Sequence, residues 1–94
     1  MEIKFEESAT KGAFFVEENG QRLANMSFSK AGDKTLIIDH TEVSDSLRGK
    51  NVGKQLVATM VDYVRKNKLN IIPLCPFTKS VIEKVKEYQD VLKK

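Results

Sequence analysis

Apolar and polar residues alternate along the first part of the chain, which is the pattern of half-buried β-strands. Ile3 and Phe5 show this pattern and predict a short first strand, and the apolar run over residues 13–16 that follows Gly12 predicts the second. Asn19-Gly20 follows them, and because both positions of a tight hairpin turn favour positive φ, the dipeptide predicts a hairpin into a third strand over residues 21–29. The alternation of this third strand is lost near Ala24-Asn25, which predicts a β-bulge there.

The hydrophobic period changes after a fourth, well-buried strand over residues 35–43, which follows a turn at Gly32-Asp33. Beyond this strand, apolar residues recur every four positions, which is the spacing of one stripe along an amphipathic α-helix. The stripe consists of Val52, Leu56, Met60 and Val64. We expect the helix to end near Asn67-Lys68, because asparagine and a basic side chain suit a helix C-terminus.

A short strand over residues 70–75 and a last helix complete the pattern. Pro73 has no backbone N–H, so this strand should be paired on one side only at that point. Thr78 or Ser80 can cap the last helix. Its apolar side contains Val81, Ile82, Val85, Tyr88 and Leu92. The element order ββββαβα predicts a mixed α+β or α/β fold, in which an antiparallel meander leads into a right-handed parallel β-α-β crossover.

Length and composition exclude several classes of protein. The chain has 94 residues, which fits a single domain over residues 1–94. It contains 40% hydrophobic residues, too many for a disordered protein, yet has no apolar run of the roughly 20 residues that span a membrane. Its one cysteine can form no internal disulfide, and no Cys/His cluster is present to hold zinc. We therefore expect a cytoplasmic protein without a membrane or metal partner.

The segment from Arg48 to Lys54 joins the buried fourth strand directly to the amphipathic helix. The first turn of a helix leaves its N–H groups unpaired, and the helix dipole adds partial positive charge there. Glycine lets a ligand approach such a backbone closely, and Arg48, Lys50 and Lys54 add positive charge around it. The segment predicts a site for an anion such as a phosphate or pyrophosphate, without identifying which one.

Two familiar phosphate loops do not fit these residues. The Walker loop requires serine or threonine after Gly-Lys, whereas Gly53-Lys54 is followed by Gln55. The dinucleotide-binding fingerprint has three glycines after the first strand of a parallel sheet, whereas this turn has two and follows a meander.

Arg48-Gly49-Lys50-Asn51-Val52-Gly53 instead resembles the acyl-CoA loop of the GCN5-related N-acetyltransferases (GNATs), whose pattern is Arg/Gln-x-x-Gly-x-Gly/Ala. Asn51 stands where the family usually has glycine, and asparagine is the other residue that best tolerates a left-handed backbone. His40-Thr41-Glu42-Val43 and Leu74-Cys75-Pro76-Phe77-Thr78-Lys79 further resemble the very small YjdJ-like branch of this family. The resemblance covers almost the whole chain and implies a minimal GNAT fold.

Larger GNATs carry one or two helices between their first two strands, and these helices shape the acceptor site. Here only about seven residues, 7–13, separate the two strands, which is too few for a helix pair. The resemblance therefore implies an open acceptor side that is completed by a bulky substrate, by a second subunit, or not at all. We expect a monomer or a weak homodimer.

The resemblance also implies a cofactor, acetyl-CoA. Its pyrophosphate would lie on the backbone amides of residues 48–54, and its pantetheine arm would pass between the fourth and fifth strands along residues 41–43. Lys79 could reach a CoA phosphate from the start of the last helix. The cofactor residues implied are Thr41, Val43, Arg48, Gly49, Lys50, Asn51, Val52, Gly53, Lys54, Phe77 and Lys79.

Three residues are candidates for the chemistry that the resemblance implies. Glu42 or His40 could take the proton of the attacking amine, and Cys75 could protonate the departing thiolate or accept the acetyl group itself. Cys75 and His40 could also face each other across adjacent strands as a nucleophile–base pair. Each has a plainer interpretation: a small buried hydrophobe for Cys75, a hydrogen-bonded structural residue for His40, and a solvated carboxylate for Glu42.

The sequence therefore favours a small N-acetyltransferase that moves an acetyl group from acetyl-CoA to an unidentified amine, carried by a small molecule or a protein. One alternative keeps the cofactor without the catalysis, as a non-catalytic acyl-CoA-binding module. A second alternative is a nucleic-acid or other anion-binding domain. It is disfavoured because the sequence shows neither a basic stripe nor exposed aromatic residues for stacking, and the net charge is only +3.

Overall fold

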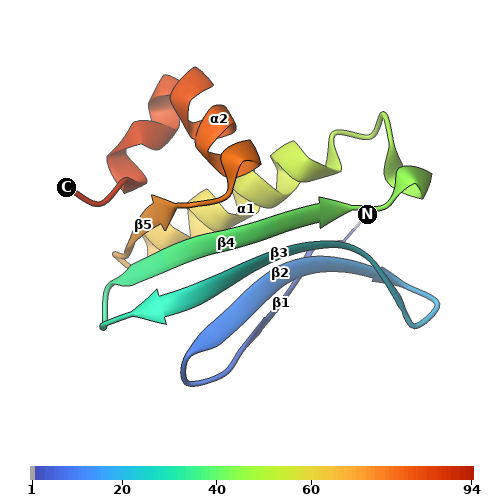
Figure 1. The fold of residues 1–94 in the computed structure, drawn as a ribbon, viewed down its shortest axis with the longest axis horizontal. Coiled ribbons are helices and arrows are strands. Elements are labelled where there is room, and N and C mark those ends of the chain that lie inside the picture. The colour runs from blue at the N-terminus through green and yellow to red at the C-terminus, as the bar shows by residue number, and fades with distance from the viewer. Residues whose placement is uncertain (1) are drawn as a thin grey trace.

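Five strands form one mixed sheet in the computed structural model, which describes residues 2–94 (Figure 1). The strands are β1 (Lys4–Glu7), β2 (Lys11–Glu18), β3 (Gln21–Ala31), β4 (Thr35–Val43) and β5 (Asn70–Pro73). They lie in the order β1-β2-β3-β4-β5; the first four are antiparallel, and β5 runs parallel to β4. A parallel neighbour needs a crossover connection, and helix α1 (Val52–Lys66) supplies it. The predicted fold is confirmed.

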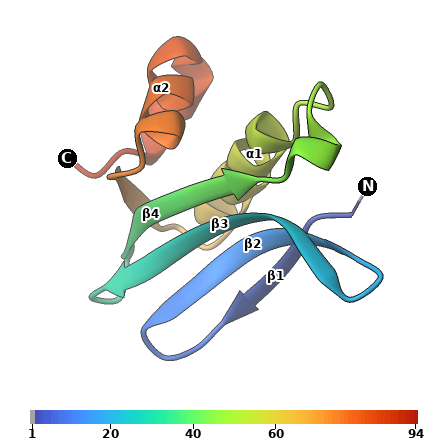
Figure 2. The ribbon, with the colours of Figure 1, turned by 45° about the vertical axis from the view of Figure 1, so that its right-hand side comes forward.

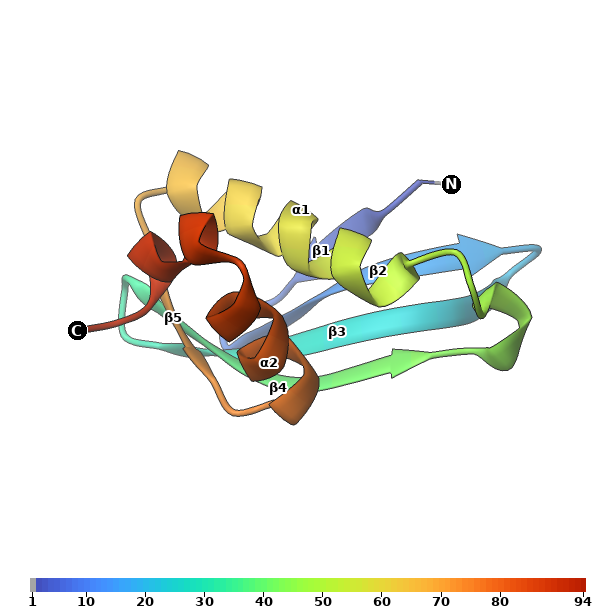
Figure 3. The same cartoon turned by 90° about the horizontal axis from the view of Figure 1, so that it is seen from above.

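Helices α1 and α2 (Pro76–Lys84) cover the same face of the sheet, and both lie in front of the strands in Figure 3. The buried side chains of α1 include the whole predicted stripe: Val52, Leu56, Val57, Met60, Val61 and Val64. They form the core together with inward-facing strand residues such as Phe14, Met26, Phe28 and Ile38. Within residues 2–94, no helix covers the opposite side, which we call the open face and which carries Phe15, Asn25, Ser27, His40 and Glu42 (Figure 2).

The turns of both hairpins in the N-terminal half of the chain are short. Asn19 and Gly20 adopt the positive φ values, 51° and 75°, that the turn between β2 and β3 requires, which confirms that hairpin. A turn over residues 8–10 joins β1 to β2, so no acceptor-shaping helix stands at this point of the described chain. The register of β2 against β3 shifts between Val16 and Glu17, which leaves Leu23 as the extra residue. The predicted bulge is therefore present, one residue earlier than expected.

A second bulge lies in β4, at a position where the sequence shows no glycine or other signal that predicts it. Ser27 of β3 pairs with His40, and the next residue, Phe28, pairs with Ile38, so Asp39 is the extra residue. Because side chains alternate along a strand, one extra residue shifts every later side chain to the other face. Beyond Asp39, Thr41 consequently points to the helix side, opposite the buried Met26.

The C-terminal part differs from the predicted single helix. Residue Val85, with an extended backbone (φ −108°, ψ 101°), ends α2, and a 3₁₀ helix η2 (Lys86–Val91) follows. The N-cap is Cys75 rather than Thr78 or Ser80, and the preceding strand ends at Pro73. The physical reason is Pro76, whose fixed φ suits the first helical position and starts the helix earlier than the polar residues suggested.

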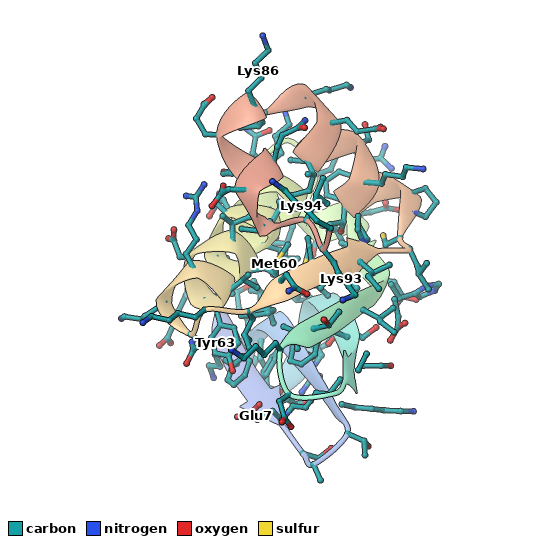
Figure 4. The ribbon with its side chains drawn as sticks, turned by 90° about the vertical axis from the view of Figure 1, so that its left-hand side faces the viewer. Glu7, Met60, Tyr63, Lys86, Lys93 and Lys94 are labelled. Carbon is teal, nitrogen blue, oxygen red and sulfur yellow. The ribbon has the colours of Figure 1, made fainter. Side chains whose placement is uncertain are left out.

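The outer edge of β5 is partly covered by the end of the chain (Figure 4). Ile71 forms a parallel bridge with Leu92, and the backbone N–H of Lys93 donates to the Ile71 carbonyl at 2.9 Å. Arg65 of α1 forms an ion pair with Asp90 at 2.6 Å and so attaches η2 to α1. At Pro73, β5 pairs only with β4, as predicted. None of the helices in residues 2–94 is both long and apolar enough to cross a membrane.

Gly12 is expected to be indispensable for the packing of β1 and β2. A Cβ atom there would collide with the ring of the buried Phe28 and lie 2.7 Å from the Glu6 carbonyl oxygen, which is backbone and cannot swing away. We expect Gly12→Ala to lower the free energy of unfolding by about 1–3 kcal/mol in urea titrations followed by circular dichroism. The exposed neighbour Lys11→Ala should change it by less than about 0.5 kcal/mol. Equal stability of the two variants would contradict the packing described.

Candidate functional site

Strands β4 and β5 separate halfway along β4. Their pairing runs from Thr35–Asn70 to Ile38–Pro73, and the N–H groups of Leu74 and Cys75 then both donate to the Ile38 carbonyl at 3.1 and 3.0 Å. The chain turns there into α2, while β4 continues to Val43. Residues 39–43 therefore have no partner on the β5 side among the described strands. An extended ligand can pair with this free backbone as an added strand would.

The segment before α1 presents unpaired N–H groups. Asn51 adopts the left-handed conformation, with φ 55° and ψ 32°, as predicted for the position where the family pattern has glycine. Its side chain does not cap the helix, and the N–H groups of Val52, Gly53 and Lys54 have no acceptor among residues 2–94. These groups lie at the positive end of a 15-residue helix. This arrangement suits a phosphate or pyrophosphate.

A cavity of about 360 Å³ connects the free part of β4 with this helix start, and we call it the cofactor cavity. Its lining residues are Thr41, Val43, Leu47, Arg48, Gly49, Asn51, Val52, Gly53, Lys54 and Phe77. The structure thus brings together every predicted cofactor residue except Lys50 and Lys79. Leu47 was not predicted; the signal for it is that it is the one apolar residue between Val43 and Val52.

Gly53 and Phe77 form the wall between the two helices. A Cβ atom at Gly53 would lie 2.7 Å from the Phe77 Cζ atom, so only glycine lets the ring pack on the first turn of α1. The ring is 39% exposed and borders the cofactor cavity. Gly53 therefore serves the packing of Phe77 and leaves its own backbone N–H uncovered.

The basic side chains divide into two groups. Arg48 lies at the mouth of the cavity, where its Nη2 atom contacts Asp45 Oδ1 at 2.9 Å and its side chain is 81% exposed. Lys50 is exposed beside the cavity, and its carbonyl accepts a hydrogen bond from Gln55 Nε2. Lys79 lines a different cavity, beside β5 and Leu92, so the structure does not bring it to the helix start.

Cys75 lies at the inner end of the gap, in a small polar cluster on the helix side. Its thiol donates to Thr41 Oγ1 at 3.3 Å, and Thr41 Oγ1 lies 3.4 Å from the hydroxyl oxygen of the fully buried Thr78. Burial alone would raise the pKa of the Cys75 thiol. In the deprotonated form, the thiolate is stabilised by hydrogen bonds with the Thr41 side chain, with the side chain and backbone of Thr78 and with the backbone of Phe77; these outweigh burial, so the pKa lies below its ordinary value. Thr78 was predicted only as a helix cap.

His40 and Glu42 lie on the open face. His40 Nε2 is 3.8 Å from Glu42 Oε1, and both side chains are largely exposed. The possible pair of Cys75 and His40 does not form, because the bulge at Asp39 turns His40 to the open face, whereas Cys75 lies beside Thr41 on the helix side. Across residues 2–94, no group of three or more His, Cys, Asp or Glu side chains is placed to hold a metal ion.

A meander extended by one parallel crossover, with diverging last strands beside an uncapped helix start, is the fold of the acyl-CoA N-acyltransferases. The family model described as GCN5-related N-acetyl-transferase matches residues 13–91. The chain belongs to this family and is an N-acetyltransferase of the acetyl-CoA-dependent class.

Several known proteins are similar to this chain. Protein NATD1 of Xenopus tropicalis is 28% identical over 82 residues, which are 86% of this chain and 75% of that protein. A GCN5-like protein of Staphylococcus aureus, solved by NMR, is 39% identical with a TM-score of 0.71, and the match covers 98% of this chain and 87% of that one.

More distant structures share the fold alone. The ribosomal-protein-alanine N-acetyltransferase of Brucella melitensis biovar Abortus 2308 is 17% identical with a TM-score of 0.62, and the match covers 93% of this chain and 64% of that one. The aminoglycoside N-acetyltransferase AAC(6')-Iy, solved in complex with CoA, is 16% identical with a TM-score of 0.54, covering 93% of this chain and 70% of that one.

Proposed function

We propose that this protein binds acetyl-CoA in the cofactor cavity and transfers the acetyl group to an amine that approaches from the open face. The observation that carries this proposal is that one cavity is bordered at both ends by backbone groups that have no hydrogen-bond partner among residues 2–94. At one end these are the N–H groups of Val52, Gly53 and Lys54, and at the other they belong to the free part of β4. The fold shared with an aminoglycoside N-acetyltransferase solved with CoA supports it.

The cofactor binds as an extended ligand along this cavity. Its pyrophosphate accepts hydrogen bonds from the first turn of α1, with Arg48 and Lys54 supplying charge at the mouth. The pantetheine amides pair with the free backbone of Thr41 and Val43, and the Phe77 ring covers the arm from the α2 side. The thioester then lies near Thr41, beside Cys75.

The proposed acetyl transfer uses groups on both faces of the free part of β4, because successive side chains of a strand point to opposite faces. On the open face, Glu42 takes the proton of the attacking amine, directly or through a water, and His40 lies beside it. The amine nitrogen bonds to the thioester carbon, and a backbone N–H near Val43 stabilises the negative charge on the carbonyl oxygen. The C–S bond then breaks, and the CoA thiolate takes the Cys75 proton, which solvent later replaces.

The placement of Cys75 favours direct transfer over an acetyl-cysteine intermediate. A cysteine nucleophile is activated by an adjacent base, by a lowered pKa or by a metal, and an adjacent base is what acyl transfer through Ser–His or Cys–His pairs uses. The side chains near the Cys75 sulfur are the hydroxyls of Thr41 and Thr78, whereas His40 and Glu42 lie on the opposite face. Because no base from the described residues lies beside it, we propose that Cys75 gives a proton rather than receives the acetyl group.

A titration of ¹⁵N-labelled protein with acetyl-CoA tests the cofactor site. We expect the largest amide shifts in residues 41–54 and 75–79, with small shifts in the β1–β2 hairpin on the far side of the sheet. Intact-mass spectrometry during turnover should show no acetyl group on Cys75. Amide shifts spread evenly over the protein, or no shifts at saturating acetyl-CoA, would contradict the proposal.

A second candidate function, a non-catalytic acyl-CoA-binding module, is favoured by one observation. The short turn between β1 and β2 leaves Glu42 and His40 without a covering acceptor wall in the described chain, and both side chains remain more than 70% exposed. Binding of acetyl-CoA without release of free CoA, across a panel of small amines, would favour this module over the enzyme.

A further inference from the structure

A second cavity, of about 500 Å³, opens on the open face at the end of β4, and we call it the acceptor cavity. It is lined by Arg22, Leu23, Ala24, Asn25, Glu42, Val43 and Ser44. Val43 also lines the cofactor cavity, so the two cavities meet at this residue. A molecule in the acceptor cavity contacts Glu42 and lies next to the free part of β4.

Arg22 is held rigidly at one side of the acceptor cavity. Its guanidinium lies 3.8 Å above the centre of the Phe15 ring, and its Nη1 and Nη2 atoms donate to the two carboxylate oxygens of Glu6 at 3.1 and 3.0 Å. Nη1 also donates to Asn25 Oδ1 at 2.9 Å. The charge of Arg22 is thereby balanced by Glu6, so the group orients Asn25 without making the cavity basic.

This contact fixes the orientation of the Asn25 amide. The carbonyl oxygen must face Arg22, because the reverse orientation would place two donors against each other. The Asn25 Nδ2 group, with two hydrogens to donate, has no acceptor within residues 2–94. Asn25 stands directly opposite Glu42 in the pairing of β3 with β4. Asn25, whose amide orientation Arg22 sets, and Glu42 therefore both line the acceptor cavity from neighbouring positions of β3 and β4.

We propose that the acceptor cavity binds amines that carry a neutral oxygen on the carbon next to the amine-bearing carbon. The neutral amino group donates a hydrogen bond to Glu42, and the oxygen accepts a hydrogen bond from Asn25 Nδ2. A carboxylate in place of the neutral oxygen is disfavoured, because Glu42 faces the same space and the Arg22 charge is already paired. Amino amides, including peptide N-termini, and amino alcohols share this chemistry. The inference rests on the proposed function and names its substrate class.

Binding of three small probes to the acetyl-CoA-saturated protein tests this inference by NMR. Ethanolamine and propylamine have equal numbers of heavy atoms and differ in the oxygen, and glycinamide represents the amino amides. We expect ethanolamine, glycinamide or both to bind about three- to tenfold more tightly than propylamine, the effect of one hydrogen bond, and to shift the Asn25 side-chain amide signal. Which of the two binds distinguishes amino alcohols from amino amides.

The variant Asn25→Asp sharpens the test. Aspartate keeps an oxygen for Arg22 but loses the Nδ2 donor, so the preference for the oxygen-bearing probes should disappear. Asn19→Asp, in the exposed β2–β3 turn, makes the same chemical change away from the cavity and should keep the preference. Equal affinities of all three probes for the wild type, or an unchanged preference in Asn25→Asp, would overturn the inference. Failure of the proposed function is seen separately, as absent acetyl-CoA shifts in residues 52–54.

Discussion

Replacing Gly53 with valine is expected to weaken acetyl-CoA binding by about 100-fold or more. A Cβ atom at this position would lie 2.7 Å from the Phe77 ring, so the ring must leave the wall of the cofactor cavity. The valine methyl groups would also cover the first-turn N–H groups that receive the pyrophosphate. Each hydrogen bond from such a donor to a charged group contributes about 1.5–3 kcal/mol, and the loss of two corresponds to at least this factor. Isothermal titration calorimetry with acetyl-CoA measures the change.

Two further variants distinguish a local effect on acetyl-CoA binding from a general effect on protein stability. Arg48→Glu places a negative charge at the cavity mouth without touching the core, and we expect it to weaken binding about tenfold at low salt. Lys93→Ala, beside β5 and outside the cofactor cavity, should leave the affinity unchanged. Thermal unfolding shows whether Gly53→Val still folds. If all three variants bind acetyl-CoA as the wild type does, the cofactor assignment is wrong.

The parts of the fold that could be predicted from sequence are those set by local chemistry. The Asn19-Gly20 turn, the four-residue stripe of α1 and the left-handed Asn51 each depend on neighbouring residues. The bounds of β4, residues 35–43, agree with prediction as well, because the Gly32-Asp33 turn marks where the strand begins and the apolar run of residues 36–38 marks its buried half. The cofactor residues come from the resemblance of residues 48–53 to the GNAT loop, and their role stays a prediction.

What could not be predicted depends on contacts between distant segments. The bulge at Asp39 arises from the pairing of β3 with β4, and nothing in residues 35–43 announces it. It nevertheless decides the site, because it places Thr41 beside Cys75 and sends His40 to the open face. The orientation of Asn25 likewise depends on Arg22, which Glu6 holds from another strand. The orientations of such side chains can be found only from the tertiary structure.

No helix covers the open face within residues 2–94, and part of it is covered by a side chain of the sheet itself. The Phe15 ring, which a helix could have covered, is instead covered by the Arg22 guanidinium and is only 7% exposed. A salt-bridged side chain thus serves both as the cover of an apolar ring and as one wall of the acceptor cavity.

Replacing Cys75 with alanine is expected to lower kcat by about 100-fold while leaving acetyl-CoA affinity within about twofold. The thiol gives its proton to the departing CoA sulfur, and a positioned acid contributes about 10²–10⁴ in rate. Its removal leaves the cofactor's other contacts intact, because the proposed binding groups are the backbone of residues 41–43 and 52–54 rather than the Cys75 side chain. Release of free CoA under saturating substrates measures kcat, and calorimetry measures the affinity.

The pH dependence of kcat distinguishes an acid from a merely structural thiol. A proton donor must be protonated, so kcat of the wild type should fall as the pH rises through the pKa of Cys75. Burial raises that pKa, but hydrogen bonds of the thiolate with Thr41 and Thr78 lower it by more. The fall in kcat should therefore begin at a pH below the ordinary pKa of a thiol. Thr41→Val removes one of these bonds and should move the fall to higher pH, and Cys75→Ala should abolish it. An unchanged alkaline profile in both variants would show that Cys75 only packs beneath the gap.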